Sequence, residues 1–458
     1  MKKFTNGCVK LVNNWLPDAF IFCIILTILA FVLAMPLTGQ GPMDMVKHWG
    51  NGVWGLLAFS MEMALVAVLG SAFASAPIIK KVLTSLAAVP KSPTAAIIMV
   101  TAVSIVCCWL QWGFGLIVGA IFAKEIAKRR NDTDYRLLIA SAYSGFVVWH
   151  AGLSGSIPLQ ITTVNDAVIK NSGGVISEAG IPLSETIMSG WNLLILLAIL
   201  ILMPIVNAKM HPSKEDVVLV DPSLLVDEEA YTPPKGKKTP AQGMENSPVL
   251  SILILLLGVV YLVWFFVNGN SLSIDSVNLI FLMLGIAFHG TPIRYVKAIG
   301  EAAGGAAGVL LQFPFYAGIQ GIMMGANPET GASLASVISN ALVNISNNVT
   351  FPVLAFLSAG IVNFFVPSGG SQWAVQGPII MPAGVALGVK NGVSAMAIAW
   401  GDAWTNMIQP FWALPALAVA KLSARDIMGY CVVDLILTGI IIIAVFLFVG
   451  ATGISAVV

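Results

Sequence analysis

Val-Pro-Ser-Gly-Gly-Ser-Gln-Trp, residues 366–373, is a polar, glycine-rich stretch in the middle of the apolar segment 351–390. The whole segment is too long for one crossing, because a bilayer core of about 30 Å needs roughly 20 apolar residues in a helix. Backbone that leaves a helix inside hydrocarbon needs new hydrogen-bond partners, so such a turn survives only against protein or a water-filled cavity. The stretch predicts a re-entrant hairpin, which enters and leaves the membrane on one side.

A second apolar segment, residues 93–130, has the same form, with Trp-Leu-Gln-Trp-Gly near its middle. Two more long apolar segments, 135–161 and 393–420, also carry polar or glycine-containing interruptions and predict two broken helices. Kinked helices in a tightly packed bundle are the alternative for any one segment. Four such interruptions in one chain favour a transporter.

The composition agrees with a membrane protein. Of 458 residues, 57% are hydrophobic and 10% are charged, against about 25% charged in a soluble domain. We expect an all-α polytopic membrane protein with about nine crossings. The five cysteines form no CxxC pair and the four histidines are scattered, so neither a disulfide framework nor a metal site is predicted. We expect no cofactor, with bound Na⁺ left open, and no nucleic acid partner at a net charge of +1.

The positive charges indicate the sidedness of the chain, since Lys and Arg concentrate in cytoplasmic loops. With a cytoplasmic N-terminus, 20 of the 23 basic residues fall on the cytoplasmic side, and only Lys47, Lys170 and Lys390 fall outside. Treating 93–130 as a full crossing would place every later loop on the wrong side. The pattern predicts a multi-pass protein of the bacterial inner (cytoplasmic) membrane with its N-terminus in the cytoplasm.

The two halves of the chain share weak sequence matches that occur in the same order, for example Gln111-Trp112 with Gln372-Trp373. Each half is predicted to contain, in order, two spans, a hairpin, a broken span and a final span. A single extra helix between them makes the second half start on the opposite side, which predicts an inverted repeat. The expected divisions are a first repeat (1–206), a cytoplasmic linker (207–246), a connecting helix (247–268) and a second repeat (272–458).

The interruptions predict a binding site for an anion. Glycine permits the turns, and a helix that begins after a turn presents free N–H groups and a positive dipole end. No Lys or Arg lies in the four interruptions, so a monocarboxylate is easier to hold there than a dicarboxylate. Seven of the 12 tryptophans lie in or beside the interruptions, either as an apolar wall for a ligand or as packing. The predicted substrate-binding residues are Trp109, Gln111, Trp112, Gly113, His150, Ser154, Ser156, Ser368, Gly369, Gly370, Ser371, Gln372, Trp373, Thr405 and Asn406.

Acidic residues inside a membrane are costly and usually functional, and this selects Asp402 and Glu62 as candidates for cation coupling. Asp402 is the preferred residue. Glu62 could instead lock two helices together by hydrogen bonds, and His150 could be a packing residue. The polar run 339–348 offers oxygens for Na⁺, with a wet surface helix as the alternative.

These motifs resemble those of the short-chain fatty acid uptake transporters, a family within the ion transporter superfamily that carries acids of acetoacetate or butyrate size. The resemblance covers essentially the whole chain through Gln-Phe-Pro-Phe-Tyr-Ala-Gly at 312–318, Pro-Ser-Gly-Gly-Ser-Gln-Trp at 367–373 and Trp400-Gly401-Asp402. It implies a scaffold and a moving transport domain, hairpin tips that bracket the substrate, a homodimer and an elevator-type motion.

The sequence therefore predicts a secondary active transporter that imports short-chain monocarboxylates in symport with H⁺ or Na⁺. A carrier of another small organic anion, a passive channel and an intramembrane enzyme are the alternatives. An ATP-driven pump is disfavoured because no GxxxxGK[ST] loop is present, and HExxH and GxSxG are absent as well.

Overall fold

The computed structural model describes residues 19–225, 239–270, 272–366 and 368–456, together with Thr5, Gly7, Cys8 and Lys10. Residues 11–18, the linker residues 226–238, and Pro367 of the stretch 366–373 lie outside the described residues. Within the described part the chain is helical, and an isolated bridge between Val389 and Ala456 is its one β-type pairing. The all-α class is confirmed.

The first half contains a pair of helices and a broken helix at the two segments predicted to be interrupted, and the re-entrant course of the pair stays a prediction. α6 and α7 are joined by Gln111 alone, and they pack against each other. The broken helix consists of α8, the 3-10 segment η1 and α9. The bounds are α2 Ala19–Thr38, α3 Pro42–Gly52, α4 Leu57–Ala74, α5 Pro77–Leu86, α6 Pro93–Leu110, α7 Trp112–Ala127, α8 Tyr135–Ser144, η1 Gly145–Ala151, α9 Ser156–Gln160, α10 Asp166–Asn171, η2 Leu183–Glu185 and α11 Gly190–Lys209.

The second half repeats this succession after η3 (Pro222–Leu225), α12 (Pro240–Glu245) and the connecting helix α13 (Pro248–Val267). α18 and α19 form its hairpin, and α20 and α21 form its broken helix. The remaining bounds are α14 Ile274–His289, α15 Pro292–Ala303, η4 Gly304–Ala306, α16 Ala307–Met324, α17 Leu334–Val343, α18 Phe351–Asn363, α19 Gly369–Ala386, α20 Asn391–Asn406, α21 Pro410–Ala420 and α22 Ala424–Ala451.

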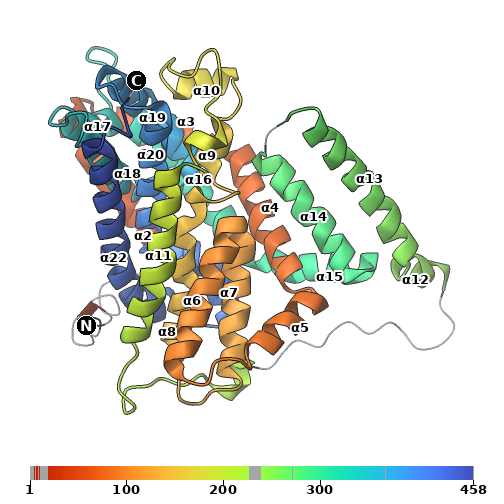
Figure 1. Ribbon diagram of the computed structural model, residues 1–458. Coiled ribbons are helices and arrows are strands. Elements are labelled where there is room, and N and C mark those ends of the chain that lie inside the picture. The colour runs from red at the N-terminus through yellow and green to blue at the C-terminus, as the bar shows by residue number, and fades with distance from the viewer. Residues whose placement is uncertain are drawn as a thin grey trace.

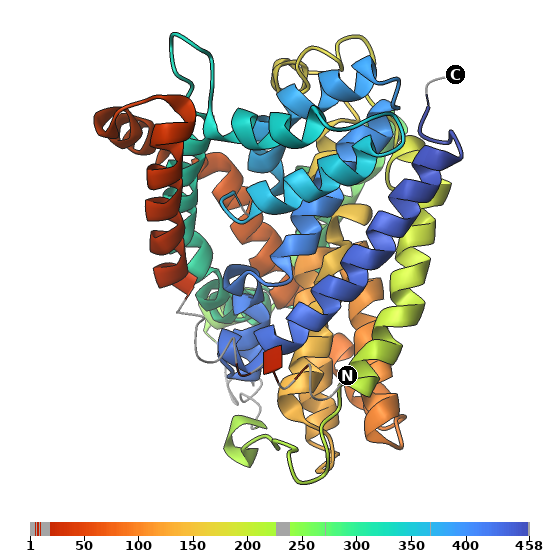
Figure 2. The same ribbon diagram turned by 90° about the vertical axis from the view of Figure 1, so that its left-hand side faces the viewer.

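Corresponding helices of the two halves each pack against helices of the other half. α4 packs against α14 and α15, and its counterpart α16 packs against α2 and α3. The last helices of the halves, α11 and α22, pack against each other, and both run most of the length of the molecule (Figure 2). Such reciprocal packing is what a two-fold relation between the halves would produce.

Short helices that the apolar runs did not predict join the long ones. α3, α5, α15 and α17 have 10 to 12 residues each, and α17 lies across the direction of α11 and α22 (Figure 2). The apolar run 302–325 is divided between the end of α15, η4 and α16. The polar run 339–348 is divided between α17 and the turn before α18. Amphipathic helices of this length carry too few consecutive apolar residues to register as spans.

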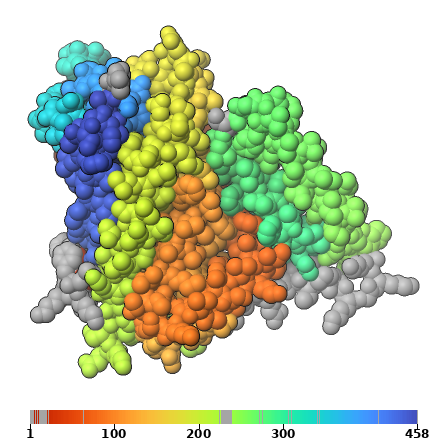
Figure 3. Space-filling model, in the orientation of Figure 1, coloured from red at the N-terminus to blue at the C-terminus, as the bar shows by residue number. Residues whose placement is uncertain are grey.

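By length and composition, five helical segments within the described residues can cross a membrane, or six if the bent pair α4 and α5 is one span. α13 is the most exposed of them and stands at one side of the molecule with α14 (Figures 1 and 3). Its exposed apolar side chains suit contact with lipid. The number of crossings stays a prediction.

The distribution of the elements is consistent with the predicted sidedness. α5 and the start of α8 lie at one end of the molecule, and α3 and α10 lie at the other (Figure 1). Lys47 belongs to α3 and Lys170 to α10, so two of the three outlying lysines lie at the end opposite α5.

Candidate functional site

The turn of the first hairpin is closed by its own side chains. Gln111 is buried and caps α7 by accepting the backbone N–H of Phe114, and its Nε2 lies 3.4 Å from the carbonyl oxygen of Val66 on α4. A methyl group at Gly113 would collide with the backbone of Val66, so this glycine permits the close approach of α4. Gln111 and Gly113 were predicted to bind substrate, and the contacts described for them are with protein.

The break in the first broken helix is fastened to this turn. Leu153 donates its backbone N–H to the carbonyl of Trp109 at 2.8 Å, and the Trp109 indole donates to the carbonyl of Ala151 at 2.9 Å. The Ser154 hydroxyl accepts the backbone N–H of Trp112 at 3.0 Å. Two N–H groups in the first turn of α7, those of Trp112 and Phe114, therefore have protein acceptors.

The second hairpin differs at the same point. α19 begins at Gly369, and the residue before it, Ser368, makes no side-chain cap. The hydroxyls of Ser368 and Ser371 are buried and have no hydrogen-bond partner among the described residues. The start of α19 is therefore a buried helix N-terminus with two unpaired hydroxyl groups, whereas the start of α7 is capped twice.

This N-terminus lies directly against the first broken helix. A methyl group at Gly369 would collide with His150 Nε2 and with Ser156 Oγ, and Gly370 is less buried than Gly369. The structure thus brings Gly369, His150 and Ser156 together from segments more than 200 residues apart in the sequence.

His150 connects the two halves. Its Nδ1 lies 2.7 Å from the carbonyl oxygen of Ala399 and 3.5 Å from Asp402 Oδ2, and its Nε2 lies 3.0 Å from Ser156 Oγ. Because a carbonyl can only accept, Nδ1 carries a hydrogen, and in a neutral ring Nε2 accepts from the Ser156 hydroxyl. All three side chains, His150, Ser156 and Asp402, are fully buried.

Asn363, at the end of α18, joins the second hairpin to the second broken helix. Its Nδ2 lies 2.8 Å from Thr405 Oγ1, 2.8 Å from Asn406 Oδ1 and 2.9 Å from the carbonyl oxygen of Asp402. Its own carbonyl accepts from Gln409 Nε2 at 2.7 Å. Thr405 and Asn406, predicted as substrate ligands, are members of this network.

Asp402 is only partly satisfied. Its Oδ2 accepts from Asn406 Nδ2 at 3.0 Å, and its Oδ1 is buried without a hydrogen-bond partner among the described residues. A buried carboxylate with one bare oxygen is costly unless a proton or cation meets it. Glu62 lies apart from this network on α4, half-buried, and its backbone carbonyl accepts from Asn278 of α14 at 3.3 Å.

The two remaining predicted residues of the second hairpin lie deeper in it. Gln372 Nε2 donates to the carbonyl of Ala359 at 2.7 Å and to Gln376 Oε1 at 2.9 Å, which ties α19 to α18. The Trp373 side chain is fully buried, and its indole N–H has no partner among the described residues.

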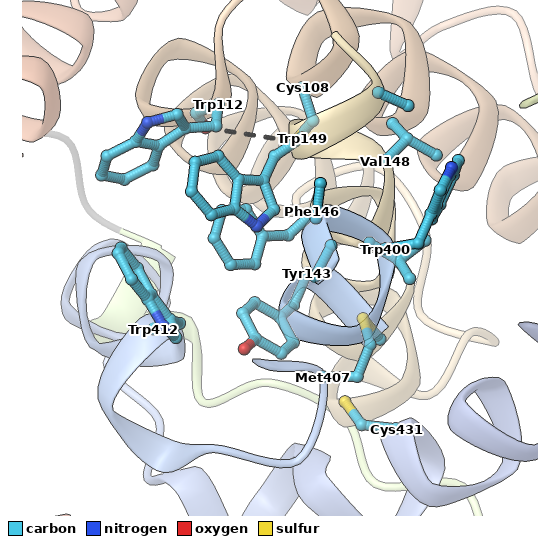
Figure 4. Packing of buried hydrophobic residues seen from close by; sticks show 14 of the residues in the cluster. Cys108, Trp112, Tyr143, Phe146, Val148, Trp149, Trp400, Met407, Trp412 and Cys431 are labelled. Atoms are coloured by element: carbon cyan, nitrogen blue, oxygen red, sulfur yellow. Dashed lines mark hydrogen bonds between the residues drawn. The ribbon is translucent and has the colours of Figure 1, made fainter. Parts of the chain in front are cut away.

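An aromatic cluster adjoins His150. Trp149 stacks on His150 with ring centroids 3.6 Å apart. Figure 4 shows Trp149 together with Trp112, Phe146 and Trp412, the rings of which come from α7, η1 and α21. Trp112 was predicted to bind substrate. Its backbone N–H donates to Ser154, and its ring packs against Trp149.

Sequence reasoning missed Asn363, Gln409 and the carbonyl of Ala399. Asn363 is an amide at the end of a largely apolar helix. Because polar side chains are rare in such helices, its presence in the sequence could have indicated a functional residue. The carbonyl of Ala399 carries no signal, since any residue supplies one. No cluster of three or more His, Cys, Asp or Glu side chains with metal-binding geometry occurs in the described part of the chain.

Known proteins similar to this chain are transporters by name. A family model described as short chain fatty acid transporter matches residues 1–449. A protein of Escherichia coli (strain K12) is 45% identical over 443 residues, which cover 96% of this chain and 98% of that protein. A protein of Haemophilus influenzae (strain ATCC 51907 / DSM 11121 / KW20 / Rd) is 44% identical over 435 residues, or 94% of this chain and 96% of that protein. Both are named "Putative short-chain fatty acid transporter".

Among solved structures, the YdaH transporter of Alcanivorax borkumensis aligns with a TM-score of 0.49 at 15% identity, over 96% of this chain and 98% of that chain.

Asn363→Ala should destabilise the protein. The change removes an amide whose two hydrogens are shared among three buried oxygens, and each buried polar group left unpaired costs roughly 1–3 kcal/mol. Thermal unfolding in detergent, followed by tryptophan fluorescence, should show a midpoint several degrees below that of the wild type. Asn268→Ala, at an exposed amide after α13, is the matched control and should leave the midpoint in place. Equal midpoints for the two variants would contradict the bridging role of Asn363.

Proposed function

Because the chain belongs to the short-chain fatty acid transporter family, we propose that it is a secondary active transporter that imports short-chain monocarboxylates of acetoacetate or butyrate size. Membership in this family makes the protein a transporter and not an enzyme. In our proposal a cation, H⁺ or Na⁺, enters with the acid, and the carboxylate binds at the start of α19.

The uncapped start of α19 is the observation that carries this proposal. A helix N-terminus offers N–H donors and a partial positive charge, and here the Ser368 and Ser371 hydroxyls add two unpaired donors. His150 and Ser156 close the same space from the other half of the chain. The start of α7 lacks comparable free donors because Gln111 and Ser154 cap it.

The charge balance favours a small monoanion. The four interruptions contain no Lys or Arg, so the site has no guanidinium or ammonium group to pair with a second carboxylate. One helix end and a few hydroxyls suit one carboxylate. A short hydrocarbon chain suits the aromatic side chains beside His150.

Asp402 is the proposed coupling residue. It lies 3.5 Å from His150, close to the proposed carboxylate position, and has a buried oxygen that no described donor meets. A proton on that oxygen, or a Na⁺ beside it, would remove the repulsion between Asp402 and an incoming carboxylate. The acid and the cation would then favour each other's binding. Glu62 has no described contact with this network, and a coupling role for it rests on its position in the sequence alone.

We further propose that the repeats are inverted, that a transport domain moves against a scaffold in an elevator-type motion, and that the protein is a homodimer. The exchange of partners between α4 and α16 supports a two-fold relation of the halves. The lysines of α3 and α10, at the end opposite α5, support the orientation with a cytoplasmic N-terminus in the bacterial inner membrane.

Proteoliposomes should accumulate labelled butyrate or acetoacetate against its gradient when an inward H⁺ or Na⁺ gradient is imposed. Imposing each gradient separately identifies the coupling ion. Flux that only equilibrates the acid would instead support a passive channel, and neither gradient driving uphill uptake would refute symport. Strong competition by an unrelated small anion together with weak competition by butyrate would favour a carrier for that anion.

Gly369→Ala should abolish carboxylate binding, because its methyl group would collide with His150 and Ser156 and displace them from the start of α19. Ser368→Ala removes one donor and should weaken binding roughly tenfold or more, since a hydrogen bond to a charged group contributes about 1.5–3 kcal/mol. Equilibrium binding of labelled butyrate measures both effects. Gly50→Ala, with open space around the new methyl group, is the control. Unchanged affinity in both site variants would exclude the start of α19 as the binding site.

Asp402→Asn should abolish gradient-driven accumulation. The amide has almost the same shape but has no charge for a proton or cation to neutralise. Uptake into proteoliposomes under each imposed gradient is the measurement. Asp426→Asn, at the exposed start of α22, is the matched control and should accumulate acid normally. Accumulation that survives Asp402→Asn would mean that another group couples the cation.

A further inference from the structure

Asp434 is a second acidic side chain in the helical interior of the molecule, and the proposed carboxylate site does not use it. It lies on α22, ten residues after Ala424, and therefore about 15 Å from the start of that helix. Its side chain is fully buried, and neither carboxyl oxygen has a hydrogen-bond partner among the described residues. Asp402, by comparison, accepts one hydrogen bond from Asn406. Among the described acids, Asp434 alone has both carboxyl oxygens buried and unpaired.

Hydrogen-bond donors near Asp434 serve backbone carbonyls and not its carboxyl group. Thr438, one turn later on α22, donates its hydroxyl hydrogen to the backbone carbonyl of Asp434 at 2.7 Å. The indole of Trp404 on α20 donates to the backbone carbonyl of Leu435 at 2.7 Å. A carboxylate in an apolar interior needs donors or a cation, and its charged form is very costly without them. The arrangement therefore fits a neutral carboxylic acid better than a carboxylate.

No basic side chain in the described part of the chain pairs with Asp434. The helices that pack against α22 are α8, α11, α18, α20 and α21. α18 and α21 contain no titratable residue, and α20 contains only Asp402. Arg136 is the second residue of α8, Lys209 the last of α11 and Arg425 the second of α22. These helix ends lie together at one end of the molecule (Figures 1 and 2), away from Asp434. The other titratable residues on these helices are Tyr135, Tyr143, Asp426, Tyr430 and Cys431.

A proton suits this position better than a sodium ion. A hard cation is held by several oxygen atoms at once. One turn to either side of Asp434 on the buried face of α22 stand Cys431, which offers sulfur, and Thr438, whose hydroxyl is bonded to the backbone. A proton needs only the carboxyl group itself.

Asp434 is connected to the proposed coupling residue through side chains of α8 and α20. Cys431 lies close enough to interact electrostatically with both Asp434 and Tyr143. The Tyr143 hydroxyl donates to the backbone carbonyl of Asn406 at 2.7 Å, and Asn406 Nδ2 donates to Asp402 Oδ2 at 3.0 Å. The two buried acids therefore share one set of neighbours.

We propose that Asp434 is a second proton-binding site, which holds a proton in the arrangement described here, and that a second cation therefore enters with each carboxylate. The proposal rests on the proposed function, in which Asp402 binds the first cation. A buried acid without hydrogen bonds is less favourable than a leucine at the same position, so packing gives no reason for it. A proton that binds and leaves during each transport cycle does give one.

Charge movement tests the second proton. One carboxylate with one cation carries no net charge, whereas one carboxylate with two cations moves about one positive charge inward. Wild-type proteoliposomes on a capacitive electrode should therefore give an inward current when butyrate is added. Asp434→Asn should still take up labelled butyrate but should lose the current, because the amide stays neutral throughout the cycle. Butyric acid that diffuses through the lipid is uncharged and adds no current.

Asp426→Asn, near the start of the same helix, is the matched control and should keep the wild-type ratio of charge to labelled butyrate. If Asp434→Asn does not fold, Asp434→Leu removes the same carboxyl group and should lose the current as well. Uptake by the wild type without a current, or an unchanged ratio in the folded Asp434 variants, would overturn the proposal. Failure of the wild type to take up any butyrate beyond protein-free liposomes would instead refute the proposed function.

Infrared spectroscopy tests the proton itself. The difference spectrum between the wild type and Asp434→Asn should contain the carbonyl band of a protonated carboxylic acid, since Asp434 is the acid that the variant lacks. A carboxylate band in its place would show that Asp434 is ionised or holds another cation, and would overturn the proton site. A purely structural carboxylic acid would give the protonated band but no change in the ratio of charge to butyrate.

Discussion

The need to satisfy backbone N–H and C=O groups away from water is the constraint on which this structure depends. A continuous helix meets it internally, but this chain interrupts four helical segments and must then supply other partners. At the first hairpin Gln111, Ser154 and the carbonyl of Trp109 supply them. At the second broken helix Asn363 donates to the carbonyl of Asp402, and Gln409 in turn donates to the carbonyl of Asn363. The start of α19 has no side-chain cap and keeps two buried hydroxyl groups without a partner among the described residues, and the proposed site lies there.

The network around Asn363 also determines which parts of the molecule form one unit. It joins α18 to α20, and Gln372 joins α19 to α18. His150 binds the carbonyl of Ala399, and the Trp400 indole donates to Asn192 on α11 at 2.9 Å, so the first half is tied to the same helix α20. Both hairpins and both broken helices are therefore held together around α20. Such a unit could move as one body without dismantling the site.

The sequence predicted the large features of the fold because each depends on a local pattern. The segment 93–130 became α6 and α7, 135–161 became α8, η1 and α9, and the connecting helix has the length its apolar run required. The short helices α3 and α15 were missed because their burial on one face does not produce a long apolar run. Residue type was enough to predict the members of the site, but the hydrogen-bond partners of each residue could not be predicted. Ser156, and not Ser154, forms a hydrogen bond with His150. The side-chain oxygen of Gln111 accepts a backbone N–H as a helix cap. Those pairings depend on contacts between distant parts of the chain.

The uncapped start of α19 has a consequence for the empty protein. Unpaired donors are most unfavourable where water cannot reach them, midway through a membrane. In the proposed mechanism, the loaded carrier has those donors satisfied, whereas the vacant carrier passes through the occluded arrangement without them. The vacant form should therefore reorient more slowly than the loaded form. The helix end proposed to bind the anion would thus suppress slippage, the futile passage of the driving cation without cargo.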